Sequence, residues 1–343
     1  MSRLQRLAGS RQARDLLLLL FIVLALLTLW LVTRDPAPES GTDPAPPQAS
    51  ASASTSVSGE AVPEPPPATN GAPSVGPDGE QLSPEELAEL LESCTALTIP
   101  SDVVVVTYNI KSGHFGGRSR LSEIIAELTA MKPDIVLLQE VRGQAQPEAL
   151  ASALGMTQFF GVNLQLGSGP SGGYGTAVLS RFPLEGPVNV RLPNRVGLEQ
   201  RGVLRARVSI QGTPLTIYGT HLQHTSPEVR LAQMQYVLTM MRKDPAAKIL
   251  GGDLNASASS PVLGAATAEL SDTWPQVGAG SGATVPADQP RGRIDYLLYD
   301  QAEDPQTTLV PLSAQVMGVG SSDHRAIRAA YRLTRTIEPA CGQ

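Results

Sequence analysis

The sequence predicts an α/β fold in which layered sheets carry helices on their outer faces. Three observations support this fold class. Residues 103–110 (VVVVTYNI) are β-branched and apolar, which is typical of a strand buried on both faces. Residues 121–132 then place apolar side chains at helical period, and the apolar run 134–140 follows, as in a strand–helix–strand unit. Residues 203–220 hold two further strand-like runs separated by a short turn, which predicts a hairpin.

The other elements follow from shorter signals. A capping box that starts at Ser83 predicts a short helix to about Ser93, and Ser226 caps a longer helix to about Lys243. The remaining expected elements, in chain order, are a helix over 147–154, strands over 157–164 and 176–182 around a glycine-rich loop at 168–175, hairpin strands 203–210 and 214–220, and strands over 248–254, 293–300 and 324–333.

The N-terminal part predicts a membrane anchor. Residues 1–15 carry four arginines, and Leu16–Val32 is an uncharged apolar run just long enough to span a bilayer as a helix. Basic residues before the run and acids after it place the N-terminus in the cytoplasm and the rest of the chain outside. A cleaved signal peptide is the alternative, but the apolar run is long for one and no small-x-small cleavage site follows it. We therefore expect a single-pass membrane protein.

Two domain-level expectations follow. Residues 33–82 are rich in Pro, Ala, Ser, Thr, Gly and acids, with few side chains large enough to bury, which predicts a disordered linker. Residues 83–343 then form one domain with a substantial core, expected to act as a monomer. Cys94 and Cys341 flank this domain, so a disulfide between them and two free thiols are both open.

The charge balance argues weakly against one class of partner. The chain has a net charge of −6, but from residue 100 onward 21 basic residues face 20 acidic ones. The domain therefore lacks the net positive charge with which proteins bind long nucleic acid. Only a local basic groove would remain for such binding. Aromatic residues, which stack on bases, make up 4% of the sequence.

The clearest candidate for chemistry is the stretch KILGGDLN, in which an apolar run leads through Gly251 and Gly252 to Asp253 and Asn255. In a strand, Asp253 and Asn255 would share a face. A carboxylate acceptor beside an amide can hold a water and a phosphate oxygen together. Both residues are also ordinary turn formers, which is the competing explanation.

Further polar residues stand at or near the ends of predicted strands. Each has an ordinary explanation as a turn former, a rim charge, an ion pair or a hydrogen-bonded histidine. Their coincidence favours one site at a sheet edge, where α/β folds carry their functional groups, and two of the chain's four histidines are among them. These residues are Asn109, Glu140, His221, Asp295, Asp323 and His324.

Nine motifs also occur in the order found in one known superfamily. They are TYNIKSG, DIVLLQEV, GYGTAVLSRFPL, QRGVLRARV, YGTHLQH, ILGGDLNA, LSDTW, RIDYLL and SSDHRAI. Over about 103–333 the chain resembles the endonuclease/exonuclease/phosphatase superfamily of deoxyribonucleases, abasic-site endonucleases, neutral sphingomyelinases and inositol polyphosphate 5-phosphatases. The resemblance implies a four-layer α/β sandwich, with two mixed β-sheets face to face and helices on both outer faces.

The resemblance also implies a metal site. Glu140 resembles the principal Mg²⁺ ligand of the superfamily, with Asn109 and Asp323 nearby. Hard oxygen ligands suit Mg²⁺, with Mn²⁺ or Ca²⁺ as alternatives. Where abasic endonucleases carry a second acid, this chain has Lys111, as in the deoxyribonuclease-like branch. A second metal is therefore not expected at that position, and Lys111 is expected to contact phosphate.

The catalytic roles are implied in the same way. Asp253 resembles the group that orients or deprotonates the attacking water, and Asn255 the group that holds it. His221 and His324 resemble the pair that binds phosphate or donates a proton, with Asp295 fixing the tautomer of His324. In-line attack on a phosphodiester needs these components.

Three more positions concern the substrate. Tyr174 is expected to line the cleft or simply pack, and Arg181 to contact phosphate or form a structural ion pair. His114 and His224 are left as loop residues without a role. The expected function is metal-dependent phosphoester hydrolysis outside the cytoplasm, on a lipid head group, a small phosphodiester, or extracellular DNA or RNA. A non-catalytic binding module on the same scaffold is the alternative from another class.

Overall fold

The computed structural model describes residues 83–86, 89, 96–318 and 320–338. The predicted anchor at 16–32, the linker at 33–82 and both cysteines lie outside the described residues, so these expectations remain predictions. Within the described part of the chain, no helix is long and apolar enough to cross a membrane. The predicted capping box is confirmed, because Ser83 N donates to Glu86 Oε2 at 2.8 Å and Glu86 N donates to Ser83 Oγ at 3.2 Å.

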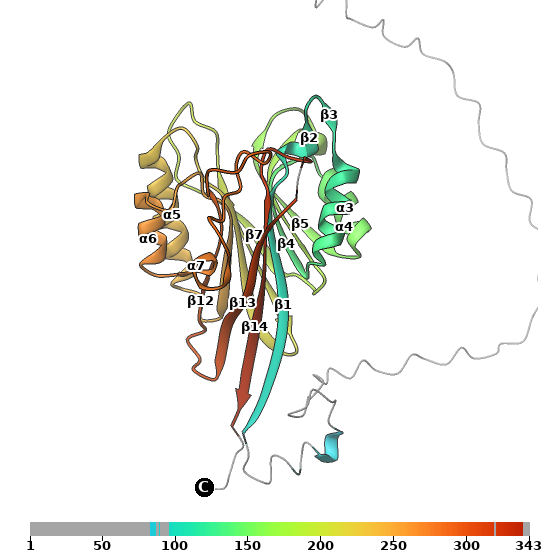
Figure 1. Ribbon diagram of the computed structural model, residues 1–343, viewed down its shortest axis with the longest axis vertical. Helices are drawn as coiled ribbons and strands as arrows, with labels where there is room; N and C mark the ends of the chain where they lie inside the picture. The colour runs from blue at the N-terminus through green and yellow to red at the C-terminus, as the bar shows by residue number, and fades with distance from the viewer. Residues whose placement is uncertain (1–82, 87–88, 90–95, 319, 339–343) are drawn as a thin grey trace, which may run out of the picture. The chain divides into compact units, whose positions relative to one another are not determined.

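Two mixed six-stranded sheets form the centre of the fold (Figure 1). The first has the order β13 (Thr307–Met317), β14 (Ala326–Ile337), β1 (Leu97–Asn109), β4 (Ile135–Arg142), β6 (Gly173–Ser180) and β5 (Thr157–Gln165). The second has the order β11 (Ser271–Asp272), β12 (Asp295–Asp300), β10 (Ala247–Asp253), β9 (Thr213–His221), β8 (Gly202–Ile210) and β7 (Glu185–Arg191). A two-stranded ribbon of β2 (His114–Phe115) and β3 (Arg118–Ser119) lies beside them.

Helices cover the outer faces of the two sheets (Figure 1). On the first sheet lie α3 (Leu121–Met131) and α4 (Ala145–Leu154), whose buried side chains share a core cluster with strands β1 and β4. On the second lie α5 (Pro227–Met241) and α6 (Pro261–Thr267). A short helix, α7 (Thr273–Val277), contacts β12 and β13. The four-layer α/β sandwich expected from the sequence is therefore confirmed.

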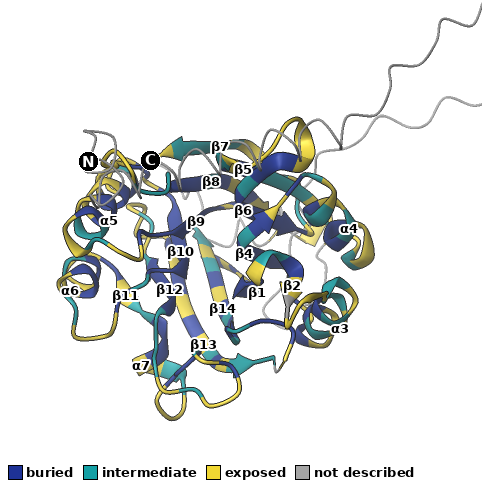
Figure 2. Cartoon of the chain, turned by 90° about the horizontal axis from the view of Figure 1, so that it is seen from above, coloured by how far each residue is buried: buried dark blue, intermediate teal, exposed yellow. Residues whose placement is uncertain are grey.

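Apolar side chains from the two sheets meet in a shared core. Leu137 of β4, Leu204 of β8 and Ile249 of β10 belong to one buried cluster that fills the space between the sheets. Figure 2 shows these inner strands as mostly buried, whereas the helices expose their outer faces. Strands buried on both sides explain why the central runs are apolar without alternation.

The sequence predicted the topology of the central elements correctly. Strand β1 pairs in parallel with β4 across α3, as the strand–helix–strand pattern requires, and β8 pairs with β9 as a hairpin. The two-residue strands β2, β3 and β11 were missed, and so were two longer strands and two α-helices. Strands β7 and β13 are sheet edges that contain proline and expose several side chains, which weakens their apolar pattern. Helices α6 and α7 are short, and α6 consists mostly of small residues, so the region was expected to be a loop.

Gly252 allows the central strand to approach its neighbour. Its φ is +154°, and a Cβ atom built there would lie 1.9 Å from the carbonyl oxygen of Thr220 on β9. We expect Gly252→Ala to lower the free energy of unfolding by at least about 2 kcal/mol, since it combines a strained backbone with overpacking. Urea denaturation of the full-length chain, followed by circular dichroism, measures this loss.

Gly264 on the exposed face of α6 provides the matched control, because a Cβ atom there would meet nothing within 4 Å. Gly264→Ala is expected to stabilise the protein by about 0.5–1 kcal/mol, as alanine does in helices. Equal denaturation midpoints for Gly252→Ala and the unmodified chain would contradict the expected close approach of β10 to β9.

Candidate active site

Three of the predicted residues form a row across the second sheet. In the register of the sheet, Asp253 at the end of β10 is opposite His221 at the end of β9 and opposite Asp295 at the start of β12. All three side chains are buried. The His221 Nε2 atom lies 3.5 Å from Asp253 Oδ2. The pairing of the strands therefore brings together groups that are far apart in the sequence.

The first sheet contributes Asn109 and Glu140 to the same place. Asn109 ends β1, and its Nδ2 donates to Glu140 Oε1 and to Asp253 Oδ2, both at 3.1 Å. Asn109 Oδ1 accepts a hydrogen bond from the backbone N–H of Lys111 at 3.1 Å. Asn109 is completely buried. One amide thus connects a carboxylate of each sheet across the interface between the sheets.

Irregular backbone directs several of these side chains. The pairing of β4 with β6 shifts register between Leu138 and Val141, and Glu140 within this bulge has a φ of +56°. Lys111 and Asn255 also have positive φ, so three of the six non-glycine residues with this conformation in the described part line the pocket. Bulges and strained residues commonly re-aim side chains at functional sites.

The structure corrects the expected relation between Asp253 and Asn255. Strand β10 ends at Asp253, so the two side chains are not aligned by strand alternation. Instead the backbone N–H of Asn255 donates to Asp253 Oδ1 at 2.8 Å, and Asn255 Nδ2 donates to the carbonyl oxygen of Leu222 at 3.0 Å. The turn between them, rather than the strand, places both residues at the pocket.

Arg230 of α5 holds the loops of this half of the site. Its guanidinium donates to the carbonyl oxygens of Gln223, His224 and Asn255. Three backbone acceptors from two separate loops are therefore tied to one helix. Sequence reasoning had assigned no role to Arg230.

His324 is paired with Asp295 as the sequence predicted. Its Nδ1 lies 2.9 Å from Asp295 Oδ2, which also accepts a hydrogen bond from Thr284 Oγ1 at 2.5 Å. Burial by itself lowers the pKa of His324, but the charge and hydrogen bond of Asp295 outweigh it and raise the pKa to about 9. At neutral pH His324 is an imidazolium whose Nε2 lies 3.7 Å from Asp253 Oδ2.

The carboxyl group of Asp253 has a raised pKa. Burial raises the pKa of its carboxyl group, and the neighbouring Asp295 raises it further. The charge of His324 and the hydrogen bonds from Asn255 and Asn109 lower the pKa of Asp253. A carboxylate whose pKa is raised takes a proton from water more readily than an ordinary aspartate.

His221 has a partner that the sequence did not predict. Arg201 Nη1 lies 3.0 Å from His221 Nδ1, and Arg201 Nη2 lies 3.2 Å from His224 Nδ1. Glu199 Oε1 forms an ion pair with Arg201 at 3.0 Å. Burial, followed by the charge of Arg201, holds the pKa of His221 well below its usual value, so this ring is neutral.

Lys111 and Tyr174 border the pocket. Lys111 Nζ lies 3.0 Å from Asp323 Oδ2, and this hydrogen bond raises the pKa of the lysine. Burial, followed by Glu140, raises the pKa of Tyr174, so its hydroxyl remains a donor. Asp323 is therefore connected to the pocket by its ion pair with Lys111.

These groups surround one cavity of ≈350 Å³. Seven predicted residues line it together with Glu199, Arg201 and His224, which sequence reasoning had missed or left without a role. Asn109, Asp295 and Asp323 support the lining residues from behind. The predicted lining residues are Lys111, Glu140, Tyr174, His221, Asp253, Asn255 and His324.

Arg181 lies away from the pocket, so the expected contact of this side chain with phosphate is not the one observed. Strand β6 runs antiparallel to β4, so Tyr174 is opposite Arg142 near the pocket while Ser180 is opposite Ile135 at the other end. Arg181 follows Ser180 and pairs with Asp134 at 3.4 Å. The structural ion pair, which was the alternative explanation, is the one observed.

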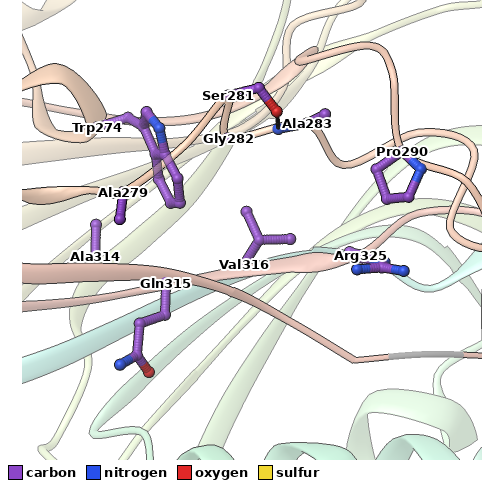
Figure 3. A pocket seen from close by; sticks show the side chains of 10 residues that line it. All are labelled: Trp274, Ala279, Ser281, Gly282, Ala283, Pro290, Ala314, Gln315, Val316 and Arg325. Atoms are coloured by element: carbon purple, nitrogen blue, oxygen red, sulfur yellow. Dashed lines mark hydrogen bonds between the residues drawn. The ribbon is translucent and has the colours of Figure 1, made fainter.

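A second cavity, of ≈400 Å³, lies beside α7 (Figure 3). Trp274, Val316 and Arg325 lie along it, and none of the residues predicted to be functional lines it. Arg325 Nε donates to the carbonyl oxygen of Ala287 at 2.7 Å. The cavity is uncharged apart from this arginine.

The donor set fits a hard divalent cation. Glu140 supplies a carboxylate that lines the pocket, and Asp323, paired with Lys111, supplies a second one. Asn109 contacts Glu140 through Nδ2, while its Oδ1 accepts from the backbone N–H of Lys111. A second group, Asp253, Asp295 and His324, has ligand atoms within 4.8 Å of one another. There His324 Nδ1 is engaged by Asp295, so the Glu140 side is the better candidate.

Comparisons with known proteins agree with this architecture. The sequence model described as "Endonuclease/Exonuclease/phosphatase family" matches residues 106–324. The uncharacterized protein YbhP of Escherichia coli strain K12 is 29% identical over 254 residues, covering 67% of this chain and 96% of YbhP.

Solved structures show the same fold. An endonuclease/exonuclease/phosphatase from Beutenbergia cavernae DSM 12333 has 28% identity and a TM-score of 0.57, covering 68% of this chain and 72% of that one. D. rerio TDP2, crystallised with a single-strand DNA product, has 20% identity and a TM-score of 0.56, covering 67% and 99%. The latter likeness concerns the fold alone.

Proposed function

Because the chain belongs to the endonuclease/exonuclease/phosphatase family, which comprises hydrolases of phosphoesters, we propose that it is a metal-dependent phosphodiesterase. The observation that carries this proposal is the convergence of Asp253, His221, His324 and Glu140 on one cavity. Water attacks phosphorus in line with the leaving oxygen. The reaction needs a base, neutralisation of the phosphoryl oxygens and help for the leaving group.

Asp253 is the base for the attacking water. Its pKa is raised by burial, and its Oδ2 atom faces donors from Asn109 and the two histidines. Asn255, fixed by the turn after Asp253, borders the position of the water. A base held in this way needs no rearrangement before it takes the proton.

His324 and Lys111 neutralise the charge that develops on the phosphoryl group. His324 is an imidazolium held by Asp295, and its Nε2–H is directed toward the side of Asp253. Lys111 supplies a second positive charge from the opposite sheet. Donors aimed at developing negative charge in a site of this kind are among the largest contributions to catalysis.

Glu140, with oxygen atoms of Asn109 and Asp323, is proposed to hold Mg²⁺, with Mn²⁺ or Ca²⁺ as alternatives. When bound, such an ion polarises a phosphoryl oxygen as a Lewis acid. Asn109 maintains the distance between this carboxylate and Asp253 through its two hydrogen bonds.

We further propose that the enzyme works at a membrane and outside the cytoplasm. Leu16–Val32 is uncharged and apolar, arginines precede it and acids follow it. The proline-rich segment 33–82 would then tether the catalytic domain to its anchor. This arrangement supports a phosphoester of the lipid surface or of the surrounding medium as the substrate.

Hydrolysis of bis-p-nitrophenyl phosphate by the purified full-length chain tests the proposed function. We expect release of p-nitrophenol with Mg²⁺ and its loss on chelation. Plasmid DNA, RNA, sphingomyelin, phosphoinositides and sugar phosphates then identify the substrate class. Hydrolysis of none of these esters, with Mg²⁺, Mn²⁺ or Ca²⁺, would favour the non-catalytic binding module.

Glu140→Gln is expected to lower kcat/KM at limiting Mg²⁺ by at least about 10²-fold, because a carboxamide removes the charge that holds the cation. Isothermal titration with Mg²⁺ should show a matching loss of affinity. Glu148→Gln, on the exposed side of α4, is the control and should change neither quantity. Unchanged Mg²⁺ affinity in Glu140→Gln would move the metal site away from this carboxylate.

A further inference from the structure

Arg201 occupies an unusual position for a charged residue. Its side chain is only 4% exposed, and its guanidinium lies between two imidazole rings and one carboxylate. Glu199 compensates the charge at 3.0 Å, which reduces the cost of burying the arginine. Neither histidine has another partner for Nδ1 among the contacts of the described residues.

The chemistry of arginine determines which nitrogen of each ring carries hydrogen. A guanidinium has only donors and stays protonated in proteins. His221 Nδ1 at 3.0 Å and His224 Nδ1 at 3.2 Å must therefore both be acceptors. A neutral imidazole with a bare Nδ1 carries its hydrogen on Nε2.

We propose that Arg201 is a positioning residue that holds His221 and His224 as Nε2–H tautomers, so that both rings present a donor toward the catalytic cavity. As an account of catalysis, this inference rests on the proposed function of the same site. The tautomers themselves follow from the hydrogen bonds of Arg201 and can be observed without substrate.

The consequence for the chemistry concerns His221. With hydrogen on Nε2, this ring cannot accept a proton from water on the cavity side, although its Nε2 lies 3.5 Å from Asp253 Oδ2. It donates a hydrogen bond to Asp253 or to a phosphoryl oxygen instead. Asp253 is then the group that receives the proton, and His221 cannot replace it as the base.

The consequence for recognition concerns the composition of the cavity wall. His221 and His224 add two neutral donors to the cationic donors of Lys111 and His324. This side of the cavity is therefore complementary to a group rich in anionic oxygen atoms, as a phosphoryl group is. Transfer of the hydrogen of either ring from Nε2 to Nδ1 would turn a donor into an acceptor facing that oxygen.

Long-range ¹H–¹⁵N correlation spectra of the histidine-labelled full-length chain test the proposal directly. The chain has four histidines, which keeps the spectra assignable. In the unsubstituted protein at neutral pH we expect a bare Nδ1 and a protonated Nε2 in His221 and His224. A protonated Nδ1 in His221 would overturn the proposal without any substitution.

The double variant Glu199→Gln/Arg201→Met removes the donor together with its counter-charge. We expect loss of the single tautomer of His221 and a decrease of kcat on bis-p-nitrophenyl phosphate by about 10- to 100-fold, with KM changed less. Arg205→Met, on β8 but lining a separate cavity, should leave spectra and kinetics unchanged. An unchanged His221 tautomer in a folded double variant would show that Arg201 does not set it.

The two proposals fail separately. If the unsubstituted chain hydrolyses no phosphoester but its spectra show the Nε2–H tautomers, the assignment of Arg201 stands and the proposed function does not. If it hydrolyses esters but His221 carries hydrogen on Nδ1, the reverse holds.

Discussion

Asp253→Asn is expected to lower kcat on a phosphodiester by about 10²- to 10⁴-fold, which is the usual contribution of a general base. The carboxamide keeps the size of the side chain but cannot take a proton from water. KM should change much less, because Lys111, His324 and Glu140 still line the cavity. Steady-state kinetics on bis-p-nitrophenyl phosphate at saturating Mg²⁺ measure both constants.

A second buried aspartate, in the connection between α5 and β10, provides the control. Asp244 accepts a hydrogen bond from Tyr218 Oη at 2.9 Å and lies before the start of β10, at the opposite end from Asp253. Asp244→Asn is expected to change stability but to retain kcat. Retention of more than a tenth of kcat in Asp253→Asn would mean that another group activates the water.

Asp295→Asn should shift the alkaline limb of the pH profile. The pKa of His324 is raised to about 9 mainly by Asp295, so activity of the unsubstituted enzyme should fall as pH rises through about 9 and the imidazolium is lost. Without the carboxylate, burial dominates and the limb should move toward or below the ordinary histidine range. At neutral pH we expect a loss of about 10²- to 10³-fold in kcat/KM.

The acid limb has a different origin. Burial raises the pKa of Asp253, so the base should be lost by protonation at a pH above the ordinary aspartate range.

Thr284→Val is the control for Asp295→Asn. It removes the hydroxyl that donates to Asp295 without removing the charge of Asp295, and should leave the alkaline limb nearly in place. An alkaline limb that stays near 9 in Asp295→Asn would exclude His324 as its source.

Most of the fold could be predicted because the central strands are buried on both faces. Continuous apolar runs such as 103–110 and 134–140 remain recognisable without knowledge of their partners. The edge strands β7 and β13 could not be found in this way, since one side of each faces solvent and both contain proline. The sandwich of four layers came from the family resemblance, because periodicity does not determine how sheets stack.

The residues of the candidate site could be predicted because each stands at or near one end of a strand. Arg181 satisfied the same rule and was misplaced, since β6 runs antiparallel to β4 and its last residue lies at the far edge. The direction of a strand depends on its pairing, which the local sequence does not contain. Asn255 was predicted at the right site for the wrong reason. Two residues separated by one position can both reach the pocket from a turn as well as from a strand, and here the turn after Asp253 places Asn255.

Arg201 was overlooked although a signal for it existed. It directly precedes β8, but an arginine beside a strand is ordinarily an exposed charge, whereas this one is buried. The hairpin register, however, pairs Val203 with Thr220, which brings the start of β8 beside the end of β9. A charged residue just before one hairpin strand should therefore be considered a neighbour of a histidine that ends the other.

The amide of Asn109 has a consequence for how activity arises during biosynthesis. Glu140 and Asp253 belong to different sheets, and a single side chain spans from one carboxylate to the other. Neither half of the sandwich holds a working centre by itself. A newly made chain should thus stay inert until the two sheets have packed together, and turnover after dilution from denaturant should return no earlier than that packing.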